Sequence, residues 1–425
     1  MQTKEMMQNI QNGVLDEKIL DIYVDATKLT YQKERYVRAI EMFETYYGAG
    51  EAEIFSAPGR SEVGGNHTDH QQGEVLATSI NLDIIGVVRR TDDNQIRIIS
   101  DDYDEVIISL DDIGYKEEER ETTTALIKGV LAGFVERGYS VGGFRAYATS
   151  DVLIGAGLSS SAAFEILIGT ILSGLYNDRS ISAIEIAIIG QYAENVYFGK
   201  PCGLMDQMAC SVGNLVHIDF KDPKNPEVEK LNFNMSEHGY SLCITDTKGS
   251  HADLTDEYAA VPQEMKAVAK YFGKEVLRDV SYADVIKEIA SLRKALGDRS
   301  VLRAVHFLCE NERVVKEVNA LKRADMNLFL NTVKESGDSS FKYLQNVYSN
   351  HDVENQNISI ALMMSDILLK TEGVSRVHGG GFAGTIQAFV KNDFVETYKA
   401  QMDHIFGEGS CKDLRIRKYG GMKVI

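Results

Sequence analysis

The order of the predicted secondary-structure elements constrains the fold more than any single motif does. Apolar residues at three- and four-residue spacing predict helices, and clusters of β-branched and aromatic residues between turns predict strands. Predicted strands cover residues 53–63, 74–90 and 95–100, predicted helices cover 124–138, 159–176 and 182–199, and most of 251–350 is predicted to be helical. Strand and helix do not alternate regularly, so we expect an α+β fold rather than one doubly wound parallel sheet.

The length of 425 residues predicts two or three domains. Residues 221–230 hold two of the five prolines and form the best candidate for a turn near a domain boundary. We therefore expect an N-terminal domain over residues 1–222 and a C-terminal domain over 223–425. Within the first, residues 1–47 are predicted to be a helical extension that packs on the domain and ends at Gly48.

Charge and composition exclude several classes of partner. The formal net charge of −18 argues against nucleic acid and against anionic membranes. No apolar run is long enough to span a bilayer, and the first residues lack an apolar signal core, so we expect a cytoplasmic protein. Five scattered cysteines without a C-x-x-C pair argue against a disulfide framework or a thiolate zinc site.

Residues 154–166, IGAGLSSSAAFEI, predict an anion-binding turn before a helix. Gly155 and Gly157 permit a tight turn, and Ser159, Ser160 and Ser161 can cap the helix that follows. Free backbone amides and the helix dipole would then face the turn, which suits phosphate. The alternative is a well-capped helix without a ligand.

Residues 378–385, HGGGFAGT, contain the spacing of a dinucleotide-binding loop without its context. A Rossmann loop leads into a helix, whereas here the strand-like TIQAFV follows. We expect a glycine loop between two strands that packs near a ligand, with a plain tight turn as the alternative.

Residues 59–73 combine charged and imidazole side chains with four glycines. His67, Asp69 and His70 have the ligand types of a zinc site, so a metal hydrolase is one candidate. Further ligands outside this stretch are hard to find, because His217 lies on a predicted buried strand and is interpreted as a core histidine. A sugar site and a phosphate site are the other candidates.

Four stretches, in this order, carry a family resemblance: GRSEVGGNHTDH (59–70), GAGLSSSA (155–162), CGLMDQ (202–207) and GGGFAG (379–384). LCENERV, at residues 308–314, is similar to a helix of the same family. From about residue 40 onward the chain resembles the GHMP small-molecule kinases and, within them, the galactokinase family. The resemblance implies a two-domain fold, with an N-terminal mixed-sheet domain, a C-terminal α/β-layered domain and the active site in the cleft between them.

The resemblance also implies an activity and its residues. The activity is transfer of the γ-phosphate of ATP to the C1 hydroxyl of galactose, with Mg²⁺ as the metal. Asp206 would face that hydroxyl, as a base or as an electrostatic partner, and Arg60 would keep it ionised. The implied sugar-binding residues are Glu62, Asn66, His67, Asp69, Gly203 and Tyr258. The implied phosphate-binding residues are Gly155, Gly157, Leu158, Ser159, Ser160, Ser161 and Ala162, and the implied metal ligands are Ser160, Ser161 and Glu194.

This assignment agrees with the chemistry of phosphoryl transfer. The reaction demands alignment and charge neutralisation more than covalent chemistry. Mg²⁺ needs only one or two carboxylates besides phosphate oxygens and water. A helix N-terminus and a bridging metal ion would also let a chain with a net charge of −18 bind an anionic substrate.

The chain departs from the family pattern at the sugar side. Glu62 stands where the family has asparagine, and Asn66 stands where it has a glutamate that resembles a ligand of the sugar 6-hydroxyl. His70 replaces a tyrosine, and Ala383 replaces a glycine. We expect galactose as the leading substrate with altered recognition at C6. A kinase for a related sugar or sugar acid and a non-catalytic galactose and ATP sensor are the alternatives, and the oligomeric state stays open, a monomer included.

Overall fold

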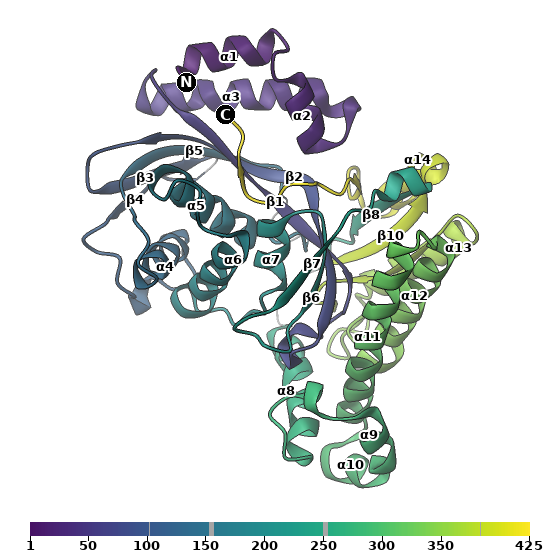
Figure 1. The fold of residues 1–425 in the computed structure, drawn as a ribbon. Helices are drawn as coiled ribbons and strands as arrows, with labels where there is room; N and C mark the ends of the chain where they lie inside the picture. Colours follow the sequence, from purple (N-terminus) through teal and green to yellow (C-terminus); the bar gives the residue numbers. More distant parts are fainter. Residues whose placement is uncertain (102, 153–156, 250–253, 383) are drawn as a thin grey trace.

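Two β-sheets organise the chain in the computed structural model, which describes residues 1–101, 103–152, 157–249, 254–382 and 384–425. The first sheet carries helices on both of its faces, and the second lies beside it with the C-terminal helices (Figure 1). This arrangement confirms the expected α+β fold with two layered parts.

The first sheet has the strand order β12-β1-β2-β5-β3-β4, with β6 paired to β2 and β7 paired to β6. Only β3 and β5 run parallel, and the other pairs are antiparallel, so the sheet is mixed as expected. Its strands are β1 Glu53–Gly64, β2 Glu74–Arg90, β3 Gln95–Ser100, β4 Val106–Ser109, β5 Phe144–Ser150, β6 Leu215–Asp219, β7 Glu227–Leu231 and β12 Met422–Lys423.

The predicted division between residues 222 and 223 falls inside the β6–β7 hairpin. Leu215 of β6 pairs with Leu231 of β7, so the first sheet continues through residue 231. The end of the chain also returns to this sheet, because Lys423 pairs with Phe55. By sheet membership, the first unit therefore extends nine residues beyond the predicted boundary and includes the C-terminal strand.

Helices α4 to α7 cover one face of the first sheet (Figure 1). Successive side chains of a strand point to opposite faces. Accordingly, Ile84 and Val88 of β2 join the core under these helices, while Ile85 and Val87 face the other way. These helices are α4 Thr123–Glu136, α5 Ser160–Tyr176, α6 Ala183–Tyr192 and α7 Met205–Val212.

The N-terminal helices cover the opposite face of the same sheet. Their bounds are α1 Thr3–Gln11, α2 Asp16–Tyr23 and α3 Leu29–Tyr47. Ile40 and Phe43 of α3 pack in one core with Ile85 and Val87. Helix α3 ends at Gly48, which has a φ of 76°. The predicted helices and the predicted packing role of residues 1–47 are therefore both present.

A buried carboxylate ties these helices to the sheet. Asp83 of β2 accepts hydrogen bonds from Arg35 of α3 at 2.7 Å and from Arg417 at 2.8 Å, and it also accepts from Tyr23 of α2 at 2.8 Å. Ser56 of β1 donates to the same carboxylate. Burial raises the pKa of Asp83, but the two guanidinium groups outweigh burial and hold the pKa below its ordinary value. Asp83 is thus an ionised centre that joins both ends of the chain to the first sheet.

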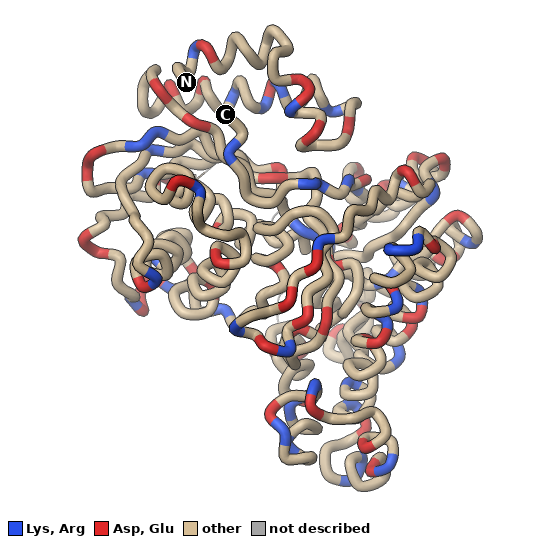
Figure 2. The backbone as a smooth tube through the Cα atoms, viewed as in Figure 1, with Lys and Arg blue, Asp and Glu red and all other residues tan. Residues whose placement is uncertain are grey.

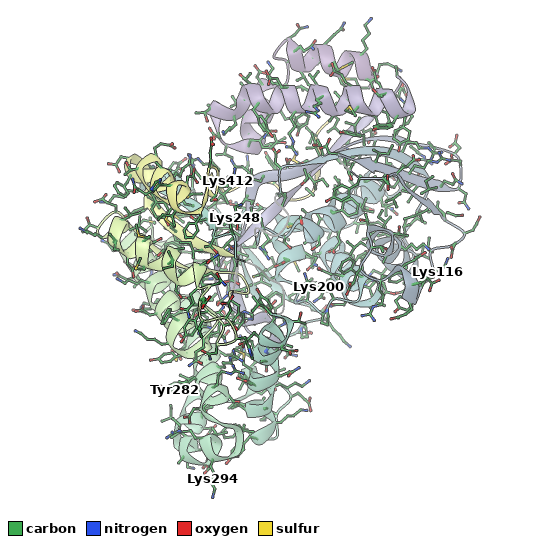
Figure 3. All side chains as sticks on the ribbon, turned by 180° about the vertical axis from the view of Figure 1, so that it is seen from behind. Lys116, Lys200, Lys248, Tyr282, Lys294 and Lys412 are labelled. Carbon is green, nitrogen blue, oxygen red and sulfur yellow. The ribbon has the colours of Figure 1, made fainter. Side chains whose placement is uncertain are left out.

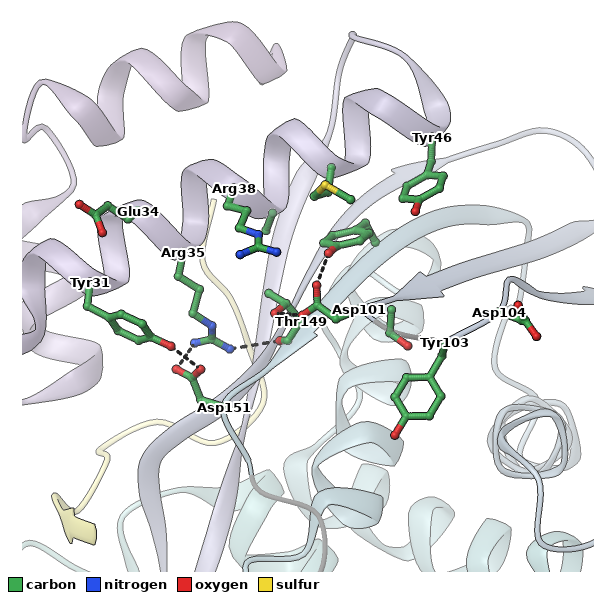
Figure 4. A pocket seen from close by; sticks show the side chains of 14 residues that line it. Tyr31, Glu34, Arg35, Arg38, Tyr46, Asp101, Tyr103, Asp104, Thr149 and Asp151 are labelled. Atoms are coloured by element: carbon green, nitrogen blue, oxygen red, sulfur yellow. Dashed lines mark hydrogen bonds and ion pairs between the residues drawn. The ribbon is translucent and has the colours of Figure 1, made fainter. Parts of the chain in front are cut away.

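A cavity of about 820 Å³ lies between α3 and strands β3 and β5 (Figure 4). Tyr31 donates to Asp151 at 2.7 Å at one end of the cavity, and Arg35 forms an ion pair with the same carboxylate at 3.1 Å. Its walls include Arg38, Tyr46, Asp101 and Tyr103. The cavity lies on the side of the sheet that α3 covers, opposite to the side of α5 and α7 that bears the predicted site.

The second sheet has the order β11-β8-β10-β9 and is antiparallel throughout. Its strands are β8 Tyr240–Asp246, β9 Gly373–His378, β10 Thr385–Lys391 and β11 Cys411–Leu414. The HGGGFAGT segment joins β9 to β10, as expected for a loop between strands. The remaining α-helices are α8 Thr255–Tyr271, α9 Tyr282–Lys287, α10 Ile289–Leu296, α11 Asp298–Lys322, α12 Met326–Ser339, α13 Asn357–Leu369 and α14 Val395–Phe406.

Short helical segments complete the fold. The 3₁₀ turns are η1 Ala26–Lys28, η2 Asp69–Gln71, η3 Glu117–Glu119, η5 Met235–His238, η6 Leu277–Asp279 and η8 Asn392–Phe394, and the π-helical turns are η4 Ala193–Phe198 and η7 Ser340–Leu344. Figure 2 shows Lys and Arg positions interspersed with Asp and Glu positions in the N-terminal and the C-terminal helices. Among the described helices, none is both long enough and apolar enough to cross a membrane.

Candidate active site

A bidentate ion pair lies at the centre of the candidate site. Asp206 is in the first turn of α7, and Arg60 is on β1, 146 positions earlier. Arg60 Nε donates to Asp206 Oδ1 at 2.7 Å, and Nη2 donates to Oδ2 at 2.6 Å. Burial raises the pKa of Asp206, but the Arg60 charge outweighs it and lowers the pKa below its ordinary value. Asp206 is therefore anionic, and its side chain keeps 27% of its surface exposed.

The serine run contacts this ion pair in a way that the sequence did not predict. Ser159 is the residue before α5, but its side chain makes no capping hydrogen bond. Instead its hydroxyl donates to Asp206 Oδ2 at 2.6 Å. Arg60 also donates through Nη1 to the Gly157 carbonyl and through its backbone amide to the Leu158 carbonyl, the latter at 3.1 Å. The start of α5 is thus tied directly to the carboxylate.

The N-terminus of α5 has the chemistry of an anion site. The first backbone amides of a helix have no partner within the helix, and the helix dipole favours negative charge there. Leu158 and Ala162 are buried in the core, so their backbone rather than their side chains can serve a ligand. Gly157 has a φ of 67°, and a Cβ there would lie 2.8 Å from Thr385 Oγ1. Gly155 lies outside the described residues.

Ser161 and Glu194 place two side-chain oxygens beside this helix end that could hold a metal ion. Ser161 Oγ donates to Glu194 Oε1 at 3.2 Å, and Glu194 sits in the π-helical turn that follows α6. Two neighbouring ligands of an octahedral Mg²⁺, each about 2.1 Å from the metal, lie about 3 Å apart. The pair therefore fits one magnesium ion. Of the two serines predicted as metal ligands, Ser161 is the one that contacts Glu194.

Lys200 is a cation near the same carboxylate that the sequence analysis did not select. Its Nζ lies 3.6 Å from Glu194 Oε1, and its side chain is 65% exposed. Figure 3 labels it near the centre of the view from behind. Its position inside FGKPCG, next to the carboxylate-bearing segments, was the available signal.

The structure brings four of the predicted sugar-binding residues to the glycine loops. Asp69 lies so close to Gly203 that a Cβ on residue 203 would overlap Asp69 Oδ2, so only glycine fits there. His67 Nε2 lies 3.0 Å from the Gly380 carbonyl, and Tyr258 Oη donates to the Gly381 carbonyl at 2.8 Å. Burial, with the nearby His70, lowers the pKa of His67 to about 3, so the ring is neutral and Nε2–H donates.

The structure places Asn66 differently from its predicted role. Asn66 is fully buried, and its amide donates to Glu62 Oε1 at 3.1 Å and to the Gly379 carbonyl at 2.7 Å. Its oxygen accepts from Ser340 at 3.2 Å and from Asn346 at 2.9 Å. Protein groups therefore occupy both polar atoms of Asn66, and none is left for the predicted contact with a sugar hydroxyl.

Glu62 was predicted to bind the sugar, but its carboxylate is engaged elsewhere. Its carboxylate contacts the Arg376 guanidinium of β9, and its side chain is almost fully buried. Burial raises the pKa of Glu62 to about 7 against the opposing charge of Arg376. The exchange of acid and amide has thus placed the carboxylate in the contact between the two sheets.

Two further residues, which were not predicted from the sequence, bind backbone amides of the segment 62–66. Glu310 of α11 accepts from the amides of Gly65 and Asn66, at 3.3 and 3.4 Å, and from Arg313 Nε at 2.6 Å. Burial raises the pKa of Glu310, but Arg313 and other neighbouring charges outweigh it, and the pKa falls to about 2. His378 Nε2 accepts from the Glu62 amide at 3.2 Å. Glu310 lies in LCENERV, which was the one signal in the sequence.

The metal-hydrolase alternative has no ligand cluster in the part of the chain that the structure describes. No group of three or more His, Cys, Asp or Glu side chains there could hold a metal ion. The His67 and His70 rings lie 6.1 Å apart between centroids. His217, on β6, has its Nε2 2.8 Å from a Glu74 carboxylate oxygen, so it is partnered as predicted, but its side chain is half-buried rather than part of the core.

Known proteins match this chain at the same segments. The galactokinase galactose-binding signature matches residues 41–90, and the GHMP kinases N-terminal domain matches residues 125–214. Galactokinase from Actinobacillus pleuropneumoniae serotype 3 is 33% identical over 84% of this chain and 90% of its own length, and that from Streptomyces coelicolor is 29% identical over 88% and 94%. The structure of Lactococcus lactis galactokinase complexed with galactose has a TM-score of 0.76 at 23% identity, covering 90% of this chain and 98% of that one. At this identity and coverage, the chain belongs to the galactokinase family of GHMP kinases.

Proposed function

We propose that this protein is a kinase that transfers the γ-phosphoryl group of ATP to the C1 hydroxyl of galactose. The observation that carries the proposal is the contact between Asp206 and the start of α5. The anionic carboxylate is held by Arg60 and by Ser159, the residue that opens the anion-binding helix. A hydroxyl that approaches Asp206 therefore also approaches a phosphate at the helix end. The relatives named galactokinase support galactose as the sugar.

In this mechanism Asp206 orients the sugar hydroxyl and receives its proton. Because Arg60 lowers the pKa of Asp206, the carboxylate is a weak base. Phosphoryl transfer passes through a loose transition state, in which alignment matters more than early deprotonation. The C1 oxygen forms its bond to phosphorus as the bond from phosphorus to the ADP oxygen breaks, and the proton of the C1 hydroxyl moves to a carboxylate oxygen of Asp206. The amides at the N-terminus of α5 stabilise the negative charge of the phosphates.

Ser161 and Glu194 would hold Mg²⁺ beside the same phosphates. When bound, the ion neutralises charge on the phosphate oxygens of the nucleotide. Lys200 adds a second positive charge at this edge and, because it is exposed, can move toward a nucleotide. Positive groups are thus concentrated where a chain with a net charge of −18 must accept an anion.

The sugar side of the proposal rests on His67, Asp69, Gly203 and Tyr258. Because Glu62 contacts Arg376 and the polar atoms of Asn66 are occupied, neither side chain is assigned to the sugar. We therefore expect weak discrimination at C6. Turnover of 6-deoxygalactose within about tenfold of galactose would agree with this, since a lost neutral contact is worth about 1 kcal/mol. A requirement for the 6-hydroxyl of several hundredfold would contradict it.

A sugar panel with ATP tests the function itself. Purified protein is incubated with ATP, Mg²⁺ and one of galactose, 6-deoxygalactose, galacturonate or arabinose. The expected result is galactose-dependent release of ADP and a product whose phosphorus couples to the anomeric proton in ³¹P NMR. Galactose binding without ADP release would favour the sensor, and ADP release with another panel sugar alone would favour a different sugar kinase.

A further inference from the structure

We propose that Gln207 is a positioning residue that holds the Glu194 carboxylate in the orientation needed for the metal. The proposal rests on the proposed role of Glu194 as a metal ligand. Gln207 follows Asp206 directly in α7, and its side chain is fully buried. It is not itself a metal ligand in this scheme.

The two carboxylate oxygens of Glu194 have different hydrogen-bond partners. Gln207 Nε2 donates to Glu194 Oε2 at 2.7 Å. The other oxygen, Oε1, faces the hydroxyl of Ser161 at 3.2 Å. The amide therefore occupies one oxygen and leaves the other on the side of the second proposed metal ligand. A carboxylate held by one oxygen cannot rotate away from Ser161 without breaking that hydrogen bond.

Glu165 fixes the amide in turn. Gln207 Nε2 also donates to Glu165 Oε2, at 3.0 Å, so the two hydrogens of one amide bridge two carboxyl groups. Glu165 is buried in α5, and its Oε1 has no hydrogen-bond partner among the residues that the structure describes. Burial, together with the nearby Glu194 charge, raises the pKa of Glu165 well above its ordinary value. The Glu165 carboxyl group thus accepts the second N–H and fixes the orientation of the amide.

Two consecutive residues in the first turn of α7 thus serve the sugar hydroxyl and the metal ion, respectively. Consecutive residues of a helix point about 100° apart. Asp206 points to Arg60 and Ser159, while Gln207 points to Glu194 and Glu165. A change at Gln207 should therefore weaken metal binding while sugar binding, through the neighbouring side chain, is retained.

Binding of Mn²⁺ in the presence of ADP, followed by electron paramagnetic resonance, tests the proposal without turnover. We expect Gln207→Leu to weaken Mn²⁺ binding about tenfold or more, as found when residues that orient metal ligands are replaced. Galactose affinity, measured by calorimetry, should change less than about twofold. Glu165→Gln should bind Mn²⁺ as the wild type does, because an amide oxygen still accepts from Gln207.

The matched control is Gln191→Leu. Gln191 is a nearby glutamine on α6 whose amide donates to the Cys202 carbonyl at 3.2 Å rather than to a carboxylate. It should keep wild-type Mn²⁺ affinity. If Gln207→Leu fails to fold in a thermal melt, Gln207→Met preserves the side-chain length and makes the same test.

Wild-type Mn²⁺ affinity in the folded Gln207 variant would overturn the positioning role, as would equal weakening in Gln191→Leu. The absence of Mn²⁺ binding by the wild type with ADP would instead overturn the metal role of Glu194, and this inference with it. Galactose-dependent ADP release by the wild type separates either failure from a failure of the proposed function.

Discussion

Asp206 and Asp83 are both carboxylates bound by guanidinium groups, and they differ in what surrounds them. Asp83 is fully enclosed, with Arg35, Arg417, Tyr23 and Ser56 around it. Among the described residues, Asp206 has one guanidinium and one hydroxyl partner, and 27% of its side chain stays exposed. The first carboxylate has no room for a ligand, whereas the second keeps a side on which a substrate hydroxyl can bind.

This difference in enclosure predicts that Asp83 matters for stability and Asp206 for the reaction. Removing one member of an enclosed ion pair leaves the other charge buried and uncompensated, which is costly. Replacing Asp206 leaves Arg60 with the Gly157 carbonyl as a partner, and the exposed side of residue 206 admits water, so the fold should tolerate the loss better than the reaction does. The same charge pairing therefore predicts opposite phenotypes at the two sites.

The largest expected effect on stability is at the enclosed carboxylate. Asp83→Asn should lower the free energy of unfolding by about 3–5 kcal/mol, because Arg35 and Arg417 lose their shared charge. Urea unfolding followed by circular dichroism measures this. The control is Asp93→Asn, an exposed partner of Arg145 that should cost at most about 1 kcal/mol. Equal, small costs for both variants would contradict the structural role assigned to the enclosed Asp83 carboxylate.

Glu310 is a third buried carboxylate, and it lies next to the site, because it accepts hydrogen bonds from the amides of Gly65 and Asn66. A pKa of about 2 in the folded state lies below the unfolded value of 4.5, so the stabilisation is present above pH 4.5 and is lost as pH falls toward 2. Glu310→Gln should therefore cost about 3 kcal/mol at pH 7, and the gap to the wild type should narrow from pH 5 to pH 3. Urea titrations across this range measure it.

The control for Glu310 is Glu335→Gln. Glu335 pairs with Lys316 on the surface at 3.1 Å, and both side chains are well exposed. Its replacement should cost at most about 1 kcal/mol at every pH. A gap at Glu310 that does not depend on pH would contradict the assignment of an ionised, guanidinium-bound carboxylate.

Arg60→Met tests the open ion pair through pH. Burial alone would raise the pKa of Asp206, so without the Arg60 charge the pKa should rise above its ordinary value. The reaction needs the ionised carboxylate, so the acid limb of the kcat/KM profile should move to higher pH. We also expect kcat/KM to fall about 10²-fold at pH 8 through lost orientation. An acid limb at the wild-type position would exclude Arg60 as the group that lowers the pKa of Asp206.

The smallest expected effect concerns the space beside the open carboxylate. Gly203→Ala would force Asp69 away from its position, because the added Cβ overlaps Oδ2. The KM for galactose should rise about five- to thirtyfold, corresponding to roughly 1–2 kcal/mol of overpacking. Gly114→Ala is the control, since no atom lies within 4 Å of its Cβ position. An unchanged KM would remove Asp69 and Gly203 from the sugar side.

Local patterns in the sequence predicted most of the elements and the order in which they occur. The long strand β2, the helix α3 that ends at Gly48, and the glycine loop between β9 and β10 all follow from periodicity and turn residues. The boundary at residue 222 was misplaced because the prolines of the β6–β7 turn mark a hairpin rather than a linker. Local composition does not distinguish these two uses of a turn.

The candidate site was harder to predict wherever a contact joins distant parts of the chain. Glu62 contacts Arg376, 314 positions away, and no local pattern indicates that this glutamate within residues 59–70 is buried against a strand of the second sheet. Ser159 has the sequence position of a helix cap, yet its hydroxyl donates to Asp206 because the carboxylate lies within reach. Motifs therefore identified the residues near the site, while the fold decided which of their atoms are free to bind.

The most direct test of the account compares Asp206→Asn with the wild type in transfer and in stability. Galactose-dependent ADP release should fall by about 10²- to 10⁴-fold, because the amide can neither accept the proton of the C1 hydroxyl nor carry the negative charge. The melting temperature should shift by only about 2–4 °C, corresponding to roughly 1 kcal/mol. Near-wild-type turnover by a folded Asp206→Asn protein would contradict the account.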